Sequence, residues 1–229
     1  MGCDPVYNPA LSTGIKTDSS MCDMRNFNWG LAALLAALLS TGLGVEAATI
    51  TVQVQNAGGA LLGDAVAFLE SPQAVRALGT AKLAPVEIAQ IAKQFEPRVT
   101  VVPIGTMVGF PNRDSVRHHV YSFSATKTFE LKLYSGTPAN PVVFDRAGIA
   151  VLGCNIHDNM VAWVVVVETP YYGRSLKPAP VVLANVPAGS YRLRVWHPGL
   201  PVGTPAIDQA LVVESADATV AVRMTGVSQ

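Results

Sequence analysis

The chain has 229 residues, of which 14% are charged and 7% are aromatic. Its 16 basic residues equal its 16 acidic residues, which excludes a strongly basic nucleic-acid-binding protein and an acidic disordered tail. The low charged fraction, together with 19 Gly and 16 Pro, favours turn-rich β structure over a coiled coil. This length allows one large domain or two small ones.

The N-terminal region has the pattern of an export signal. Arg25 precedes an apolar run, residues 31–43, and the run is followed by a small-residue cleavage pattern that ends at Ala47. The run is shorter than the roughly 20 apolar residues that a membrane-spanning helix needs, although an uncleaved anchor is the alternative. We therefore expect residues 24–47 to be a signal peptide and residues 1–23 to be an extension upstream of the true start codon. The mature protein is then periplasmic and has no membrane segment.

Removal of residues 1–47 changes the meaning of the cysteine count. Cys3 and Cys22 lie in the removed part, so Cys154 is the one cysteine of the mature chain and has no partner for an intramolecular disulfide. A lone thiol in an oxidising compartment is a liability unless it is buried, pairs with another chain or binds a metal. The mature chain keeps 14 basic and 12 acidic residues, and a net charge of +2 gives little electrostatic steering toward a partner.

Short segments of alternating or continuous apolar residues predict β-strands along most of the mature chain. Residues 49–55 alternate between apolar and polar side chains, and a second strand, 65–69, follows a turn. Residues 72–95 differ, because Val86, Ile88 and Ile91 have roughly helical spacing, and we expect one or two short helices or an ordered connector there. Strand spacing of about 8–12 residues indicates an all-β sandwich. The further predicted strands are 98–104, 106–110, 118–124, 128–134, 141–144, 149–152, 160–167, 181–184, 190–196, 209–213 and 218–224.

One short segment combines three types of metal-ligating side chain. Residues 154–160 read Cys-Asn-Ile-His-Asp-Asn-Met and so carry a thiol, an imidazole and a thioether. Two His and one Cys in a plane, with a weak axial Met, form the ligand set of blue copper sites. His118, which starts a predicted strand after a turn, is the candidate for the second His, so the predicted ligands are His118, Cys154, His157 and Met160. Zinc bound by Cys and His is one alternative, and a Cys that is simply a small buried residue is another.

Two segments resemble the plastocyanin- and amicyanin-type cupredoxins. They are residues 111–120, Pro-Asn-Arg-Asp-Ser-Val-Arg-His-His-Val, and residues 148–161, Gly-Ile-Ala-Val-Leu-Gly-Cys-Asn-Ile-His-Asp-Asn-Met-Val. The resemblance covers roughly residues 94–168, and the closest overall likeness is to bacterial periplasmic proteins called methylamine utilisation proteins. It implies a Greek-key cupredoxin β-sandwich that binds one type 1 copper ion, with His118, Cys154 and His157 as equatorial ligands and Met160 as the axial ligand.

His119 follows the predicted ligand His118 directly. Both cannot bind the same ion, because successive residues of a strand point to opposite faces. Proteins of the amicyanin type carry at this position an Asn that hydrogen-bonds to the residue after the Cys, which is Asn155 here. We therefore expect a contact between His119 and Asn155 behind the ligands, of the kind that orients ligands and tunes the reduction potential.

The segments that flank the cupredoxin-like region resemble a different fold. Residues 49–69 and 183–196 are similar to carboxypeptidase-regulatory-like, or transthyretin-like, β-sandwich domains. We expect residues 49–70 and 170–226 to form one small split sandwich, with a connector (71–93) and the cupredoxin domain (94–168) inserted between the two parts. The alternative is that these strands extend the cupredoxin sheets.

The predicted function is one-electron transfer between redox partner proteins, such as a dehydrogenase or a cytochrome. A copper-binding or copper-delivery protein without a redox role would have the same ligands and is the alternative. We do not expect an enzyme, because His119 and His197 alone remain beyond the ligands, which is too few for a second copper centre in one chain. His197 is expected to be structural. No Ser-His-Asp order, Gly-rich phosphate loop or paired-carboxylate motif indicates another catalytic site.

Overall fold

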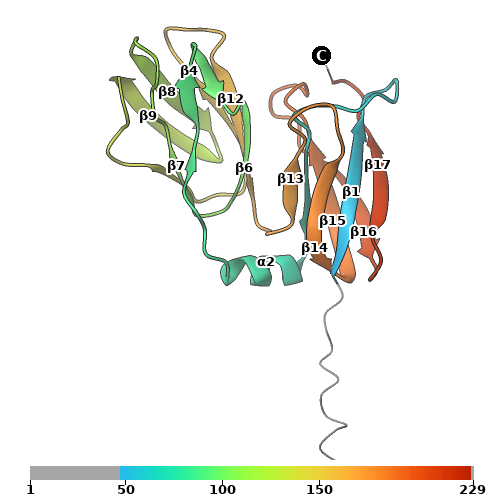
Figure 1. The fold of residues 1–229 in the computed structure, drawn as a ribbon. Helices are drawn as coiled ribbons and strands as arrows, with labels where there is room; N and C mark the ends of the chain where they lie inside the picture. Colours follow the sequence, from blue (N-terminus) through green and yellow to red (C-terminus); the bar gives the residue numbers. More distant parts are fainter. Residues whose placement is uncertain (1–46, 228–229) are drawn as a thin grey trace, which may run out of the picture. The chain divides into compact units, whose positions relative to one another are not determined.

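The computed structural model describes residues 47–227, and these residues fold into β-strands with one helix, α2 (Pro72–Gly79) (Figure 1). The predicted all-β fold class is confirmed. The predicted extension, nearly all of the predicted signal peptide, Cys3 and Cys22 lie outside the described residues. Between residues 47 and 227, no helix has the length and apolar character needed to cross a membrane.

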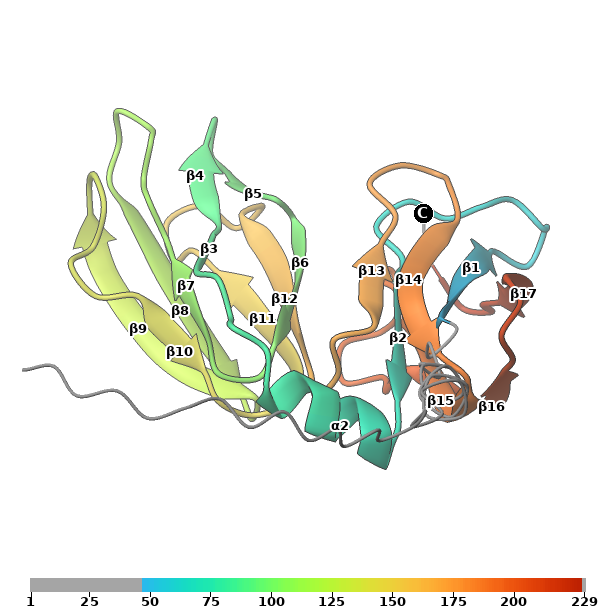
Figure 2. The same ribbon diagram turned by 60° about the horizontal axis from the view of Figure 1, so that its bottom comes forward.

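The middle of the chain forms a two-layered structure, here called the central sandwich. Its two main sheets have the strand orders β6-β12-β11-β8-β9 and β10-β7-β3, and the course of these strands can be followed in Figure 2. Side chains from both sheets share one buried core that includes Phe110, Phe144 and Leu152. Its strands are β3 (Val86–Glu87), β4 (Ala89–Ile91), β5 (Gln94–Glu96), β6 (Val99–Pro103), β7 (Thr106–Gly109), β8 (His118–Ser124), β9 (Lys127–Tyr134), β10 (Val142–Phe144), β11 (Gly148–Gly153) and β12 (Val161–Val167), of which β4 and β5 form a separate hairpin.

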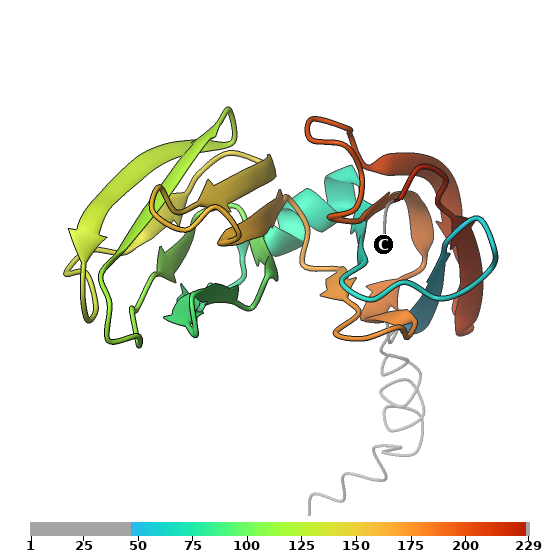
Figure 3. The ribbon, with the colours of Figure 1, turned by 90° about the horizontal axis from the view of Figure 1, so that it is seen from above.

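The two ends of the described chain form a second two-layered structure, here called the terminal sandwich. Its strands are β1 (Ala47–Gln55), β2 (Val66–Glu70), β13 (Tyr172–Arg174), β14 (Val181–Pro187), β15 (Gly189–Trp196), β16 (Ile207–Val213) and β17 (Ala218–Arg223). The sheet orders are β14-β1-β17 and β13-β2-β15-β16. In Figure 3 the blue strand β1 lies among the orange and red strands, because Ile50 pairs with Leu183 on one side and with Ala218 on the other.

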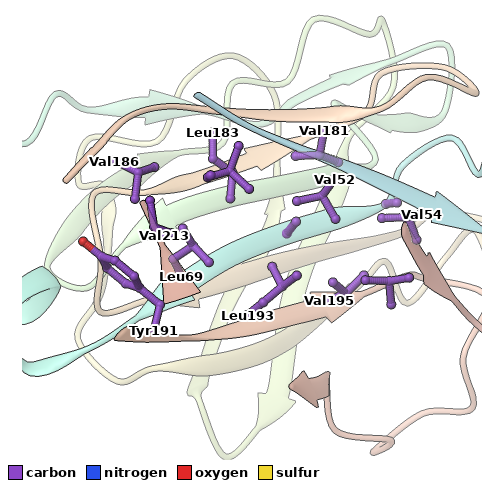
Figure 4. Packing of buried hydrophobic residues seen from close by; sticks show 14 of the residues in the cluster. Val52, Val54, Leu69, Val181, Leu183, Val186, Tyr191, Leu193, Val195 and Val213 are labelled. Carbon is purple, nitrogen blue, oxygen red and sulfur yellow. The ribbon is translucent and has the colours of Figure 1, made fainter. Parts of the chain in front are cut away.

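The terminal sandwich has a hydrophobic core of its own. Side chains of both sheets, among them Val52, Leu69, Leu183 and Leu193, point into one buried cluster (Figure 4). Strands from residues 47–70 and from residues 172–223 therefore share sheets and a core. This arrangement supports our proposal that residues 49–70 and 170–226 form one split domain.

Strand β12 is apolar at all seven positions because both of its faces are buried. Ala162, Val164 and Val166 belong to the core of the central sandwich. The alternate residues Val165 and Val167 belong to another cluster, which contains Trp196 of the terminal sandwich and against which Trp163 packs. The ring centroids of Trp163 and Trp196 are 6.3 Å apart. A strand covered on both faces needs no polar face, which explains why the period-2 alternation is missing here.

Residues 72–95 differ in part from the expectation. Helix α2 begins after Ser71, whose side-chain oxygen accepts the backbone N–H of Ala74 at 3.0 Å, and this agrees with one short helix. The helical spacing of Val86, Ile88 and Ile91 was misleading, because Val86 lies in β3 and pairs with Val108, and Ile91 lies in β4. Ile88 is buried in the central core, so the central sandwich starts ahead of the expected residue 94. Strand β13 was also not predicted.

His197 is held as a neutral imidazole in the terminal sandwich. Its Nε2–H donates to the Gly63 carbonyl at 2.8 Å, and its Nδ1 accepts the Gly199 backbone N–H at 2.9 Å. Burial lowers the pKa of His197, and the hydrogen bond with Gly63 offsets part of this effect. The structural role expected for His197 is consistent with these contacts.

This arrangement predicts acid sensitivity. The folded-state pKa of His197 lies below the unfolded value of about 6.5, so its stabilising effect is complete above that pH and is lost as the pH falls. We expect the free energy of unfolding, measured with urea, to decrease from pH 7 to pH 5. His197→Gln, which keeps one donor and one acceptor, should make this decrease shallower. An identical pH slope in the variant would assign the acid sensitivity to other groups.

Candidate metal centre

The sheet topology brings the predicted ligands to one end of the central sandwich. Strand β11 ends at Gly153, immediately before Cys154, and the loop 154–160 leads into the antiparallel strand β12. Strand β8, which begins at His118, is the other neighbour of β11, and Gly153 pairs with Tyr121. In antiparallel strands the end of one lies beside the start of the next. His118 and the loop therefore meet although His118 and Cys154 are 36 positions apart in the sequence.

Three donor atoms converge at this end. One ligand atom each of His118, Cys154 and His157 lies within 4.8 Å of the other two. The Cys154 Sγ is 3.8 Å from the His157 Nδ1, and the imidazole centroids of His118 and His157 are 5.0 Å apart. His118 and Cys154 are buried, whereas His157 is partly exposed. The structure thus brings together three of the four side chains that the sequence singled out as ligands.

Met160 is the last residue of the loop 154–160. It is fully buried and belongs to the same hydrophobic cluster as Cys154. Its backbone N–H donates to the His157 carbonyl at 3.0 Å, which fixes the loop between the two residues. Its role as an axial ligand stays a prediction.

The imidazole of His118 has one satisfied and one unsatisfied nitrogen. Its Nε2 lies 2.8 Å from the Asp114 Oδ2, whereas its buried Nδ1 has no hydrogen-bond partner among the described residues. An unsatisfied buried polar atom costs about 1–3 kcal/mol, and coordination of a metal ion would remove this cost. A thiol, two imidazoles and a thioether fit copper, because soft sulfur and imidazole ligands are those that copper prefers. The residues present therefore fit a type 1 copper ion.

A hydrogen-bonded network lies beside the centre. His118 pairs with Tyr134 of β9, whose hydroxyl donates to the Phe110 carbonyl at 2.6 Å. The pKa of Tyr134 is raised to about 12, chiefly by burial. The hydrogen bond that the buried Gln90 donates to the Tyr134 hydroxyl lowers this pKa, and the electrostatic interaction with Cys154 raises it further. The phenol is therefore neutral over the whole physiological pH range. Asn112 donates to the Tyr134 carbonyl at 2.9 Å and ties the loop before His118 to the same network.

His119 is buried next to His118, and a β-bulge lies beside it. The register shifts between His118, which pairs with Tyr134, and Val120, which pairs with Leu131, so β9 has one extra residue there. The His119 Nε2 lies 3.0 Å from the Glu130 Oε1, and its ring packs edge-on against Tyr121. Asn155 is exposed. The expected contact between His119 and Asn155 stays a prediction.

The role of Asp114 was not predicted from the sequence. Asp114 lies in the segment 111–120 that resembles the cupredoxins, four residues before His118. This spacing places side chains together in a helix, but it has no fixed meaning in a loop. Only the loop conformation, which the hydrogen bonds of Asn112 maintain, brings the carboxylate to His118.

Comparison with known proteins finds a likeness to copper proteins of known structure. No known protein-family profile and no curated protein matches the chain. An amicyanin variant in its reduced Cu(I) form is 21% identical over 44% of this chain and 98% of its own, with a TM-score of 0.34. A purple cupredoxin from Nitrosopumilus maritimus is 24% identical over 36% of this chain and 99% of its own, with a TM-score of 0.32.

A third solved structure is a copper-containing nitrite reductase from Thermus scotoductus SA-01. It is 23% identical over 38% of this chain, with a TM-score of 0.35, and the match spans only 23% of the reductase chain. All three likenesses cover less than half of the present chain.

Proposed function

We propose that this protein is a periplasmic type 1 copper protein of the cupredoxin type, which transfers single electrons between redox partner proteins. The observation that carries the proposal is the convergence of the Cys154 thiol with the imidazoles of His118 and His157 within 4.8 Å. The unsatisfied, buried Nδ1 of His118 and the buried Met160 support the same ligand set. One copper ion per chain would be held by His118, Cys154, His157 and Met160.

The protein surroundings suit an electron carrier. Copper, when bound, supplies the Cu(I)/Cu(II) couple. The paired strands β8, β9 and β11 position His118 and Cys154, so the ligand geometry would change little between the two oxidation states of a bound copper ion. His157 is the most exposed of the three converging ligands, and Ile156 beside it is 48% exposed, so a partner would approach at this loop. An acceptor or donor such as a dehydrogenase or a cytochrome fits this role.

Burial of the ligands favours electron transfer over copper delivery. His118 is completely buried and Cys154 is 4% exposed, so release of the ion would require the loop to open. A delivery protein needs ligands that a recipient can reach. We further propose export through residues 24–47 and kinship with the methylamine utilisation proteins, on the sequence features given above.

The decisive experiment is a copper titration of the mature protein, residues 48–229. We expect one equivalent of Cu(II) to produce an intense sulfur-to-copper charge-transfer band at about 600 nm. The band should disappear on reduction and return on reoxidation, which cyclic voltammetry would show as one reversible couple. A colourless protein that binds one equivalent of zinc instead would contradict the proposal. Rapid loss of Cu(I) to a chelator would favour delivery.

A further inference from the structure

Asp114 connects the metal centre to a separate hairpin. Its Oδ2 lies 2.8 Å from the His118 Nε2. Its Oδ1 accepts the backbone N–H of Ala92 at 2.7 Å, and its Oδ2 accepts that of Lys93 at 2.9 Å. Both of these residues form the tip of the β4–β5 hairpin and have positive φ angles, 52° and 57°. Two positive φ angles in a two-residue hairpin loop turn consecutive N–H groups toward one acceptor, which here is the carboxylate.

These contacts hold the Asp114 carboxylate in place, because it accepts two backbone N–H groups of the hairpin and faces the His118 Nε2. The Asp114 backbone N–H also donates to the Asn112 side-chain oxygen at 2.9 Å. The carboxylate is thus held from both sides and is not a freely rotating surface group.

A fixed carboxylate decides which nitrogen of His118 carries the proton. A carboxylate only accepts hydrogen bonds, so Nε2 carries the proton, and in the neutral imidazole Nδ1 is then the free electron-pair donor. This agrees with the unsatisfied Nδ1 found in the buried ring. A hydrogen bond of this kind also makes the ligand more basic and fixes the orientation of the ring.

Resting on the proposed copper function, we propose that Asp114 is a positioning residue of the metal centre. Its carboxylate selects the His118 tautomer whose Nδ1 is free to bind the ion, and its negative charge favours the more highly charged Cu(II) state. The charge acts through one imidazole ring from a site that is only 14% exposed, so solvent screens it incompletely. Removal of the charge should therefore raise the reduction potential.

The main test is the reduction potential of the copper-loaded Asp114→Asn variant, measured by voltammetry. Asn keeps the size of the side chain and an oxygen that can accept from Nε2, but it loses the charge. We expect the variant to stay blue and to have a higher potential than the unaltered protein. The matched control is Asp217→Asn, because Asp217 also accepts a backbone N–H, that of Thr49 at 2.7 Å, but in the terminal sandwich. The control should leave the potential unchanged.

A second measurement needs no copper and separates this inference from the proposed function. Nitrogen-15 NMR of the metal-free protein should show His118 with its proton on Nε2. A proton on Nδ1, or a blue Asp114→Asn variant with an unchanged potential, would overturn the role of Asp114. If the unaltered protein does not turn blue, the proposed function fails, and the NMR result still decides whether Asp114 sets the tautomer. The same NMR result decides the matter if Asp114→Asn does not fold.

Discussion

Replacement of Cys154 by Ser is expected to abolish the visible absorbance of the copper-loaded protein. The band at about 600 nm arises from charge transfer between a thiolate and copper, and a neutral serine hydroxyl cannot replace the thiolate. Because Ser is close to Cys in size, it fits this buried position, and the fold should be retained. Absorbance spectra after Cu(II) addition, together with urea unfolding of the metal-free proteins, would measure both effects.

The matched control for this prediction is His119→Asn. His119 is buried directly beside the ligand His118, but its Nε2 faces Glu130, so its loss should leave the blue band in place. Retention of the band in Cys154→Ser would exclude the thiolate as a ligand. Loss of the band in His119→Asn would show instead that His119 is the ligand and that His118 has another role.

Replacement of Trp196 by Ala is expected to produce the largest loss of stability, about 3–5 kcal/mol, as is typical of a truncated buried Trp. Trp196 is 4% exposed and belongs to the cluster that also contains Val165 and Val167 of β12. Its removal would leave a cavity beside Trp163. Urea unfolding followed by circular dichroism would measure the change in the free energy of unfolding.

The control is Val202→Ala, because Val202 is 84% exposed and its truncation should change the stability little. The Trp196→Ala protein should still form the blue site, since all four proposed ligands belong to the central sandwich. A loss of stability below about 1 kcal/mol would show that the cluster around Trp196 contributes little to the fold. Loss of the blue band with an intact fold would show that the terminal sandwich also shapes the metal centre.

The metal-site motif was readable from the sequence because its residues are chemically unusual and close together. Cys154, His157 and Met160 lie within seven residues, and Cys154 is the one cysteine that remains if residues 1–47 are removed as expected. The alternating segment 49–55 and the turn after it likewise predicted β1 correctly, since local periodicity reports which face of a strand is buried. Short apolar segments were less informative, and Val86 and Ile91 fitted a helix as well as the strands that they form.

The sequence by itself determined the all-β class, most of the strands and the four candidate ligands, because each of these depends on local pattern and residue chemistry. Only the tertiary structure decided which residues pack against these strands and hydrogen-bond to these ligands. The burial of β12 on both faces depends on contacts with Trp196, and the β-bulge beside His119 depends on the register with β9. The hydrogen bond between Asp114 and His118 depends on two loops that meet in space. No local periodicity encodes such contacts, since they join segments that are distant along the chain and that only the fold brings together in space.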